Sequence, residues 1–188
     1  MLPVADISVG IAGAARLARF DLEGFEYFDN SIHGFWQSFY AAVVIAPLFL
    51  ILILIQYLTT EGGGPFLHYL IIEGLAYVIA WTAFPVIMLS FSYHLGREMN
   101  YIRYFVAYNW IAVIQSIVYM PIAVFGITGA FPPDVANLLA VMALLWILAL
   151  TFFVTRHALE IPPGTAVAVV AMDFLLGLLI ETISSRFA

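Results

Sequence analysis

The sequence contains no cysteine and no lysine, and its six basic side chains are all arginines. The absence of cysteine excludes disulfide bonds, thiolate metal sites and cysteine nucleophiles. Because twelve acidic residues outnumber the six arginines, the formal net charge is −6. A chain with this charge lacks the basic surface that follows a phosphate backbone, so nucleic acid is excluded as a class of partner.

Charged residues of either sign are also few. They make up 10% of the 188 residues, whereas hydrophobic residues make up 64%, and the mean hydropathy is +1.05. Soluble domains are about half apolar and about a quarter charged. The composition therefore predicts a membrane protein, and no segment shows the alternation of period two that is typical of membrane-spanning strands.

Five apolar stretches are long enough to cross a hydrocarbon core of about 30 Å, for which a helix needs about 20 residues. The short segments between them contain glycine, proline and charged residues, which favour turns. The sequence predicts an all-α, polytopic membrane helical bundle with a transmembrane domain over residues 36–184. Its five spans are residues 36–58, 66–93, 101–125, 135–155 and 163–184.

The placement of arginine predicts the orientation, because basic residues near the ends of spans stay on the cytoplasmic side. Arg16 and Arg19 precede the first span, Arg97 and Arg103 flank the second loop, and Arg156 lies in the fourth loop. The first and third loops contain no arginine. We therefore expect a multi-pass protein of the cell inner membrane, with its N-terminus inside and its C-terminus outside.

Residues 1–35 form a segment that precedes the spans. Its beginning has no basic region, so we do not expect a cleavable signal peptide. Apolar residues such as Ile7 and Ile11 recur at helical spacing, whereas Glu23 and Glu26 lie off this stripe. This pattern is typical of an amphipathic helix in the membrane interface, and it equally fits a segment that folds back onto the cytoplasmic ends of the spans.

Asp173 lies about ten residues into the fifth span, near the middle of the bilayer, and no arginine lies at that depth. Ionisable residues at membrane depth are candidates for function. The polar face of the third span offers partners, since Tyr108 and Gln115 share one face and Asn109 lies beside it. Asp173 is either a proton or ion site or a neutral group that joins two helices. We expect the second, with a hydrogen bond to Gln115, Asn109 or Tyr108.

Glu73 lies about two turns inside the outer end of the second span. Together with His68, five residues earlier, it could form a shallow polar cavity. A glutamate at this depth can also extend its carboxylate to the outer interface without any function.

The cytoplasmic loops contain a second group of polar side chains. Arg97 and Arg156 are expected to form ion pairs with Glu160 and Glu98. A less favoured alternative is a zinc or iron site, if the two loops are neighbours. Its ligands would be His94, Glu98, His157 and Glu160.

Four stretches in the loops and the spans that follow them are distinctive: YHLGR at 93–97, YIRYFVAY at 101–108, LWILAL at 145–150 and RHALEIPPGTA at 156–166. They resemble the bacterial branch of the Yip-domain family, of the Ypt/Rab-interacting-protein type. The similarity covers roughly residues 30–184. The resemblance implies a five-span helical bundle with a cytoplasmic N-terminus and a non-enzymatic role. Eukaryotic members act in vesicle traffic and contact small GTPases, and the family supplies no catalytic residues.

Motifs for phosphate binding, nucleophile elbows, zinc metalloproteases and dinucleotides are missing, so we expect neither an enzyme nor a cofactor. The leading hypothesis is a membrane scaffold or accessory protein. Its partners would be bilayer lipid and another membrane protein or a second copy of the chain. The alternative is a small transporter or proton-coupled channel that uses Asp173 and Glu73.

Overall fold

The structure is a computed structural model that describes residues 4–60 and 64–188. This part of the chain is helical and contains no strand. Five of its helical segments are long and apolar enough to cross a membrane, which confirms the all-α, multi-pass architecture. The elements are α1 (Val4–Leu17), η1 (Leu22–Tyr27), α2 (Ile32–Ser38), α3 (Tyr40–Thr59), α4 (Phe66–His94), η2 (Glu98–Asn100), α5 (Tyr101–Ile127), α6 (Pro133–Leu159) and α7 (Pro163–Phe187).

The spans agree with the predicted ranges to within a few residues at most ends. The first span begins earlier than predicted, at Ile32, because α2 continues into α3 through Phe39, whose backbone is itself helical. Ser31 defines this start, since its side chain accepts a hydrogen bond of 3.1 Å from the Gly34 backbone N–H. Such a cap satisfies one of the free N–H groups at the beginning of a helix.

The turns at the ends of the spans follow from the local sequence. The first residue of α6 is Pro133 and that of α7 is Pro163, at a position where proline loses no helical hydrogen bond. Helix α6 ends at Leu159, and Glu160, which follows it, has a left-handed backbone (φ 54°). Gly96 follows α4 with a φ of 62°, a conformation that glycine adopts without strain.

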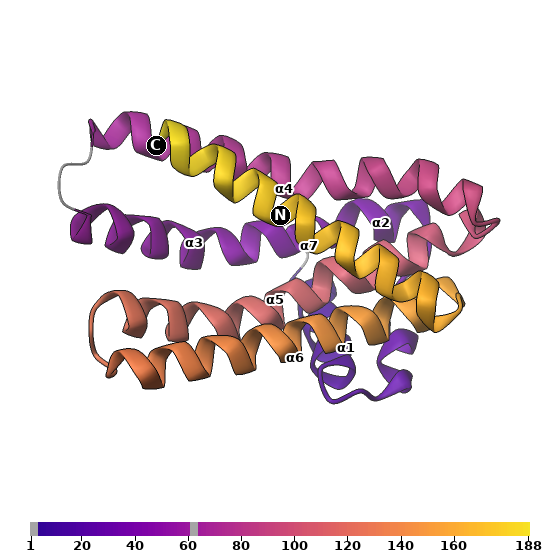
Figure 1. Cartoon of the computed structure of the whole chain (residues 1–188). Coiled ribbons are helices and arrows are strands. Elements are labelled where there is room, and N and C mark those ends of the chain that lie inside the picture. The colour runs from indigo at the N-terminus through magenta and orange to yellow at the C-terminus, as the bar shows by residue number, and fades with distance from the viewer. Residues whose placement is uncertain (1–3, 61–63) are drawn as a thin grey trace.

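Helix α5 is the centre of the bundle and packs against α1, α2, α3 and α6. Its Tyr104, Phe105, Ala107 and Ile111 are fully buried. Figure 1 shows α7 running diagonally across the bundle, from the turn after α6 to the first half of α4. Helix α5 therefore forms the core, and α4 and α7 form the periphery.

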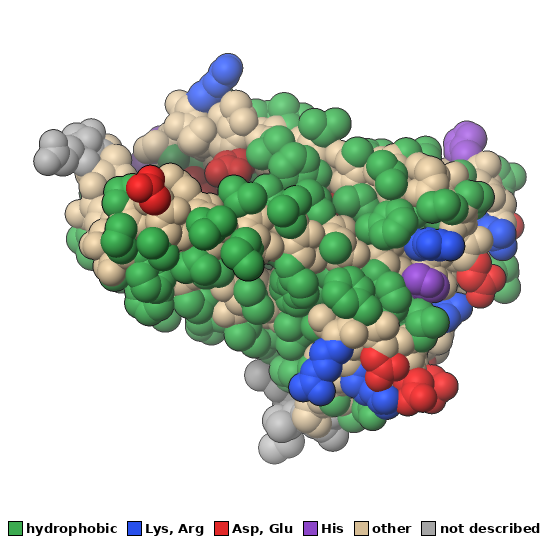
Figure 2. Space-filling view, turned by 60° about the horizontal axis from the view of Figure 1, so that its bottom comes forward, with side chains coloured by type: hydrophobic (Ala, Val, Ile, Leu, Met, Phe, Trp, Pro, Cys, Tyr) green, Lys and Arg blue, Asp and Glu red, His purple; other side chains and the backbone are tan. Residues whose placement is uncertain are grey.

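The surface divides into an apolar belt and a charged end. Figure 2 shows hydrophobic side chains over most of the visible face, with arginine, acidic side chains and histidine gathered at one end. The helix connections bring five arginines to this end, and Arg186, in the last turn of α7, lies at the opposite end. The five arginines are Arg16, Arg19, Arg97, Arg103 and Arg156.

The N-terminal segment folds back onto this charged end. Helix α1 crosses α5 where Gly10 meets Trp110, so closely that a Cβ atom on Gly10 would lie 2.3 Å from the indole ring. Gly13 and Gly24 give α1 and η1 a similarly close approach. The packing agrees with the fold-back interpretation, and the depth of α1 in the bilayer stays a prediction.

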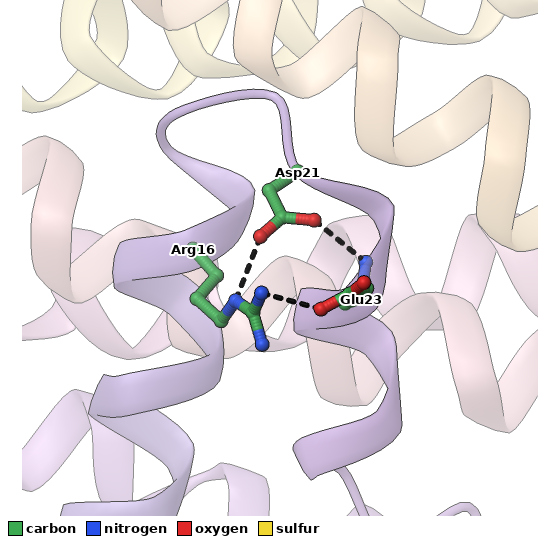
Figure 3. Close-up of polar contacts among 3 residues, drawn as sticks. All are labelled: Arg16, Asp21 and Glu23. Carbon is green, nitrogen blue, oxygen red and sulfur yellow. Dashed lines mark hydrogen bonds and ion pairs between the residues drawn. The ribbon is translucent and has the colours of Figure 1, made fainter.

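Arg16 of α1 fixes the turn that follows it (Figure 3). Its Nε lies 2.7 Å from Asp21 Oδ2, and its Nη2 lies 2.5 Å from Glu23 Oε2. Asp21 also caps η1, accepting a 3.0 Å hydrogen bond from the Glu23 backbone N–H. This backbone hydrogen bond, together with Arg16, lowers the pKa of Asp21.

Candidate functional site

Asp173 pairs with the third span, as predicted. The Tyr108 hydroxyl of α5 donates a hydrogen bond of 2.8 Å to Asp173 Oδ1 of α7. Among the three partners proposed from the sequence, Tyr108 is therefore the one that the structure supplies. Both side chains are partly buried, and Asp173 is the eleventh of the 25 residues of α7, near the middle of the helix.

A small polar network surrounds this pair. The ring of Tyr104 lies 5.7 Å from that of Tyr108, and the Tyr104 hydroxyl lies 3.4 Å from Thr155 Oγ1 of α6. Tyr104 and Thr155 are fully buried. The network therefore connects α5 to both α6 and α7. Hydrogen bonds of this kind between polar side chains stabilise the association of helices inside a membrane.

Gln115 and Asn109 bind other helices than α7. Gln115 Nε2 donates to Thr151 Oγ1 of α6 at 3.1 Å. Asn109, which is only 1% exposed, donates through Nδ2 to Ser38 Oγ of α2 at 2.8 Å. Tyr108, Asn109 and Gln115 therefore form hydrogen bonds to three different helices. The predicted hydrogen bond between Asp173 and one of these three residues is confirmed with Tyr108 as the partner.

Glu73 lines a cavity between the spans, at the end opposite the cluster of five arginines. The cavity has a volume of about 650 Å³ and lies among the second half of α3, the first half of α4 and the second half of α7. Glu181 is a second acidic residue that lines this cavity. The expected partner of Glu73, His68, does not line it. His68 instead contacts the Phe187 backbone oxygen through Nε2 at 2.7 Å.

The walls of the cavity combine aromatic, acidic and small side chains. Glu73 lies beside Ser184, whose hydroxyl donates to the Glu181 backbone oxygen at 3.1 Å. Asp173 is not among the lining residues. The lining includes Phe49, Tyr57, Tyr69, Glu73, Tyr77, Gly177 and Glu181.

The ion pairs predicted in the loops are wrong. In residues 4–60 and 64–188, neither Arg97 nor Arg156 forms an ion pair. Instead, Arg103 Nη1 lies 3.1 Å from Glu160 Oε1. Arg103 stands in the first turn of α5, and the left-handed backbone of Glu160 forms the corner after α6. The two side chains therefore meet across the ends of these neighbouring helices, whereas Glu98 is exposed.

The two loop histidines are not brought together with the loop carboxylates. His94 Nδ1 lies 2.7 Å from the Ser90 carbonyl, and His157 Nδ1 lies 2.7 Å from the Phe153 carbonyl. Each ring is thus oriented by a carbonyl one turn back in its own helix. Within the described chain, no group of three or more metal-ligating side chains occurs.

Arg103 is a residue that the sequence analysis used only for orientation. Besides Glu160, its guanidinium lies 5.0 Å from the centre of the Phe25 ring in η1. Asn100 adds a hydrogen bond of 3.2 Å to the Leu159 carbonyl. Arg103 therefore links the N-terminal segment to the corner between α6 and α7. In the sequence, its position at the start of a span is the only indication of this role.

Comparisons of the chain with protein-family models, with curated proteins and with solved structures give no match. The resemblance to Yip-domain proteins consequently rests on the sequence motifs alone. The structure has two separate candidate sites. One is the polar network centred on Tyr108 and Asp173, and the other is the acidic cavity at Glu73.

Proposed function

We propose that the chain is a non-enzymatic scaffold or accessory protein of the inner membrane, similar in role to Yip-domain proteins. One observation carries the proposal: the polar side chains of α5 at membrane depth bond to neighbouring helices. Tyr108 binds α7, Gln115 binds α6 and Asn109 binds α2. Polar groups arranged in this way stabilise a particular packing of helices.

The two ends of the molecule support this function differently. The arginine-bearing end, with α1 and η1 folded against it, offers a charged surface to a partner on the cytoplasmic side. Along the spans, α4 presents an apolar outer face that includes Leu75, Val78 and Val86. Such a face contacts lipid or the span of another membrane protein.

A small transporter or proton-coupled channel is the second candidate. The cavity at Glu73 favours it, since an ionisable group inside a membrane protein often marks a route for a solute. Against it, Asp173 lies outside that cavity and is bound to Tyr108. The two carboxylates that would have to act together are therefore in different surroundings.

The proposal is tested by the mass of the protein in its native membrane. The full chain would be extracted from its host in polymer-bounded membrane particles, and its mass and accompanying chains measured. We expect a complex of fixed stoichiometry, either with a second membrane protein or with further copies of the chain. A protein that is strictly monomeric and without partners would contradict the scaffold function.

A further inference from the structure

Aromatic rings form much of the wall of the cavity between α3, α4 and α7. Phe49 and Tyr77 stack with their ring centres 4.6 Å apart, and the rings of Tyr57 and Tyr69 lie 5.5 Å apart. The hydroxyls of Tyr57, Tyr69 and Tyr77 each donate a hydrogen bond to a neighbouring oxygen atom. These contacts hold the rings in place. Fixed aromatic rings attract organic cations through their electron-rich faces.

The charge of the cavity has one sign. Glu73 of α4 and Glu181 of α7 line it, and neither forms an ion pair with any residue that the structure describes. All six arginines belong to the described ranges, none lines the cavity, and the sequence has no lysine. Glu73 is partly buried and Glu181 is exposed. Arg186 lies at the same end of the bundle but outside the wall of the cavity, so the lining carries negative charge that none of its own side chains balances, and it favours a cation.

The size of the cavity suits a small organic molecule. Its volume of about 650 Å³ lies within the range of about 300–1,000 Å³ that is usual for ligand pockets. Ala76, Ala80 and Gly177 keep it open, and a Cβ atom on Gly177 would meet nothing within 4 Å. Figure 2 shows the surface hollowed near the end opposite the arginine cluster, with acidic side chains inside the hollow.

We propose that this cavity binds an organic cation that carries apolar groups, held by Glu73 and Glu181 and by the tyrosine rings. An anion would be repelled by the carboxylates, and a neutral apolar ligand would leave them without an opposite charge. Two sources can provide this chemistry, a soluble lipophilic cation or the ammonium headgroup of a membrane lipid. The site is independent of the scaffold function, because it lies at the other end of the bundle from Arg16, Arg19, Arg97, Arg103 and Arg156.

The first test compares two probes of the same shape and opposite charge. The full chain is purified in a non-ionic maltoside, and the binding of tetraphenylphosphonium and of tetraphenylborate is measured by calorimetry. We expect one tetraphenylphosphonium per chain and no tetraphenylborate. Glu73→Gln keeps the shape of the side chain and removes its charge, so it should weaken tetraphenylphosphonium roughly tenfold or more. Glu98→Gln, at the opposite end, should leave the affinity unchanged.

A second test fills the cavity without changing its charge. Gly177→Leu projects a side chain into the cavity and meets no protein atom at its Cβ, so the fold should be kept. We expect tetraphenylphosphonium to bind roughly tenfold or more weakly. Gly74→Leu is the matched control, since Gly74 also has open space at its Cβ but lies outside the lining of the cavity. It should bind like the wild type.

A third measurement distinguishes the two sources of the cation. Phosphatidylethanolamine or phosphatidylglycerol is added to the maltoside micelles before tetraphenylphosphonium. Displacement by phosphatidylethanolamine alone identifies a lipid ammonium group as the occupant, and no displacement by either lipid identifies a soluble cation. The proposal is overturned if tetraphenylborate binds as tightly as tetraphenylphosphonium, or if Glu73→Gln and Gly177→Leu both bind tetraphenylphosphonium like the wild type.

Discussion

Tyr108 and Asp173 form the polar link between α5 and α7, with the Tyr108 hydroxyl 2.8 Å from Asp173 Oδ1. The link joins the central helix to the helix that crosses the bundle diagonally (Figure 1). A carboxyl group at this depth needs a partner, because lipid offers none. The pair therefore gives the carboxyl group in the middle of α7 a hydrogen-bond partner inside the bundle.

The first prediction concerns the energy of this link. Tyr108→Phe removes the donor and should lower the free energy of unfolding by about 1 kcal/mol. In a double-mutant cycle with Asp173→Leu, we expect a coupling energy of about 0.6–1.5 kcal/mol. Unfolding in mixed micelles measures both quantities. Tyr93→Phe is the control, since Tyr93 is 72% exposed and should tolerate the change. Strict additivity of the two substitutions would contradict a direct link.

The second prediction concerns the crossing of α1 and α5. Gly10→Ala places a methyl group against the Trp110 ring and should cost about 1–3 kcal/mol through overpacking. The same change at Gly74, where the Cβ meets nothing, should be neutral or stabilise by up to about 1 kcal/mol. Unfolding of both variants in micelles gives the comparison. Equal effects at the two glycines would show that α1 does not pack on α5.

Particular residues show how much of this fold the sequence could predict. The spans were found to within a few residues because long apolar runs and proline-containing turns mark them, as Pro133 and Pro163 do. The link from Asp173 to Tyr108 was among the predicted possibilities because the polar face of α5 follows from helical spacing. Gln115 lies on the same face seven residues further along, about 10 Å away, where α6 is the neighbour. Which polar residue of α5 meets Asp173 therefore depends on where α7 crosses α5, and the sequence does not specify that point.

The remaining features depend on contacts between distant segments. The sequence does not identify Gly10 as the point where α1 approaches α5 closely, because a glycine indicates a turn equally well. The pairing of Arg103 with Glu160 depends on the left-handed backbone at Glu160, which spacing does not specify. The cavity joins Glu73 to Glu181 only because the second half of α7 lies beside the first half of α4.

The third prediction separates Arg103 from the other arginines at its end. Arg103→Ala loses the ion pair with Glu160 and the contact with the Phe25 ring. Because both contacts are partly exposed, the loss in the free energy of unfolding should be about 1 kcal/mol. Arg156→Ala, which breaks no ion pair in the described structure, should cost little. A larger loss for Arg156→Ala than for Arg103→Ala would contradict the assignment.

The fourth prediction concerns acid. Hydrogen bonds from the Glu23 N–H and Arg16 to Asp21, and from the Ser31 hydroxyl and N–H to Asp29, lower the pKa of both carboxyls below 3.8. Since their folded pKa is lower than the unfolded value, they stabilise the N-terminal segment above pH 3.8. This contribution is lost as the pH falls through the folded pKa. Hydrogen exchange of residues 21–31, corrected for intrinsic rates, should show opening only below about pH 4.

A variant checks the origin of this pH dependence. Asp21→Asn keeps a side chain that can cap η1 but removes the charge that pairs with Arg16. Protection of residues 21–27 should then be lower at neutral pH and should change less on acidification. If Asp21→Asn showed the same acid transition in this segment as the wild type, the titration would belong to other groups.

The claim that polar side chains at membrane depth join helices is tested most directly by flux through reconstituted vesicles. Full-length wild type, Asp173→Asn and Glu73→Gln are placed in proteoliposomes, and the movement of protons and of tetraphenylphosphonium is measured against protein-free vesicles. We predict no flux above the protein-free background for any of the three proteins. Proton or tetraphenylphosphonium flux in the wild type that Asp173→Asn abolishes would contradict the account and establish a transporter.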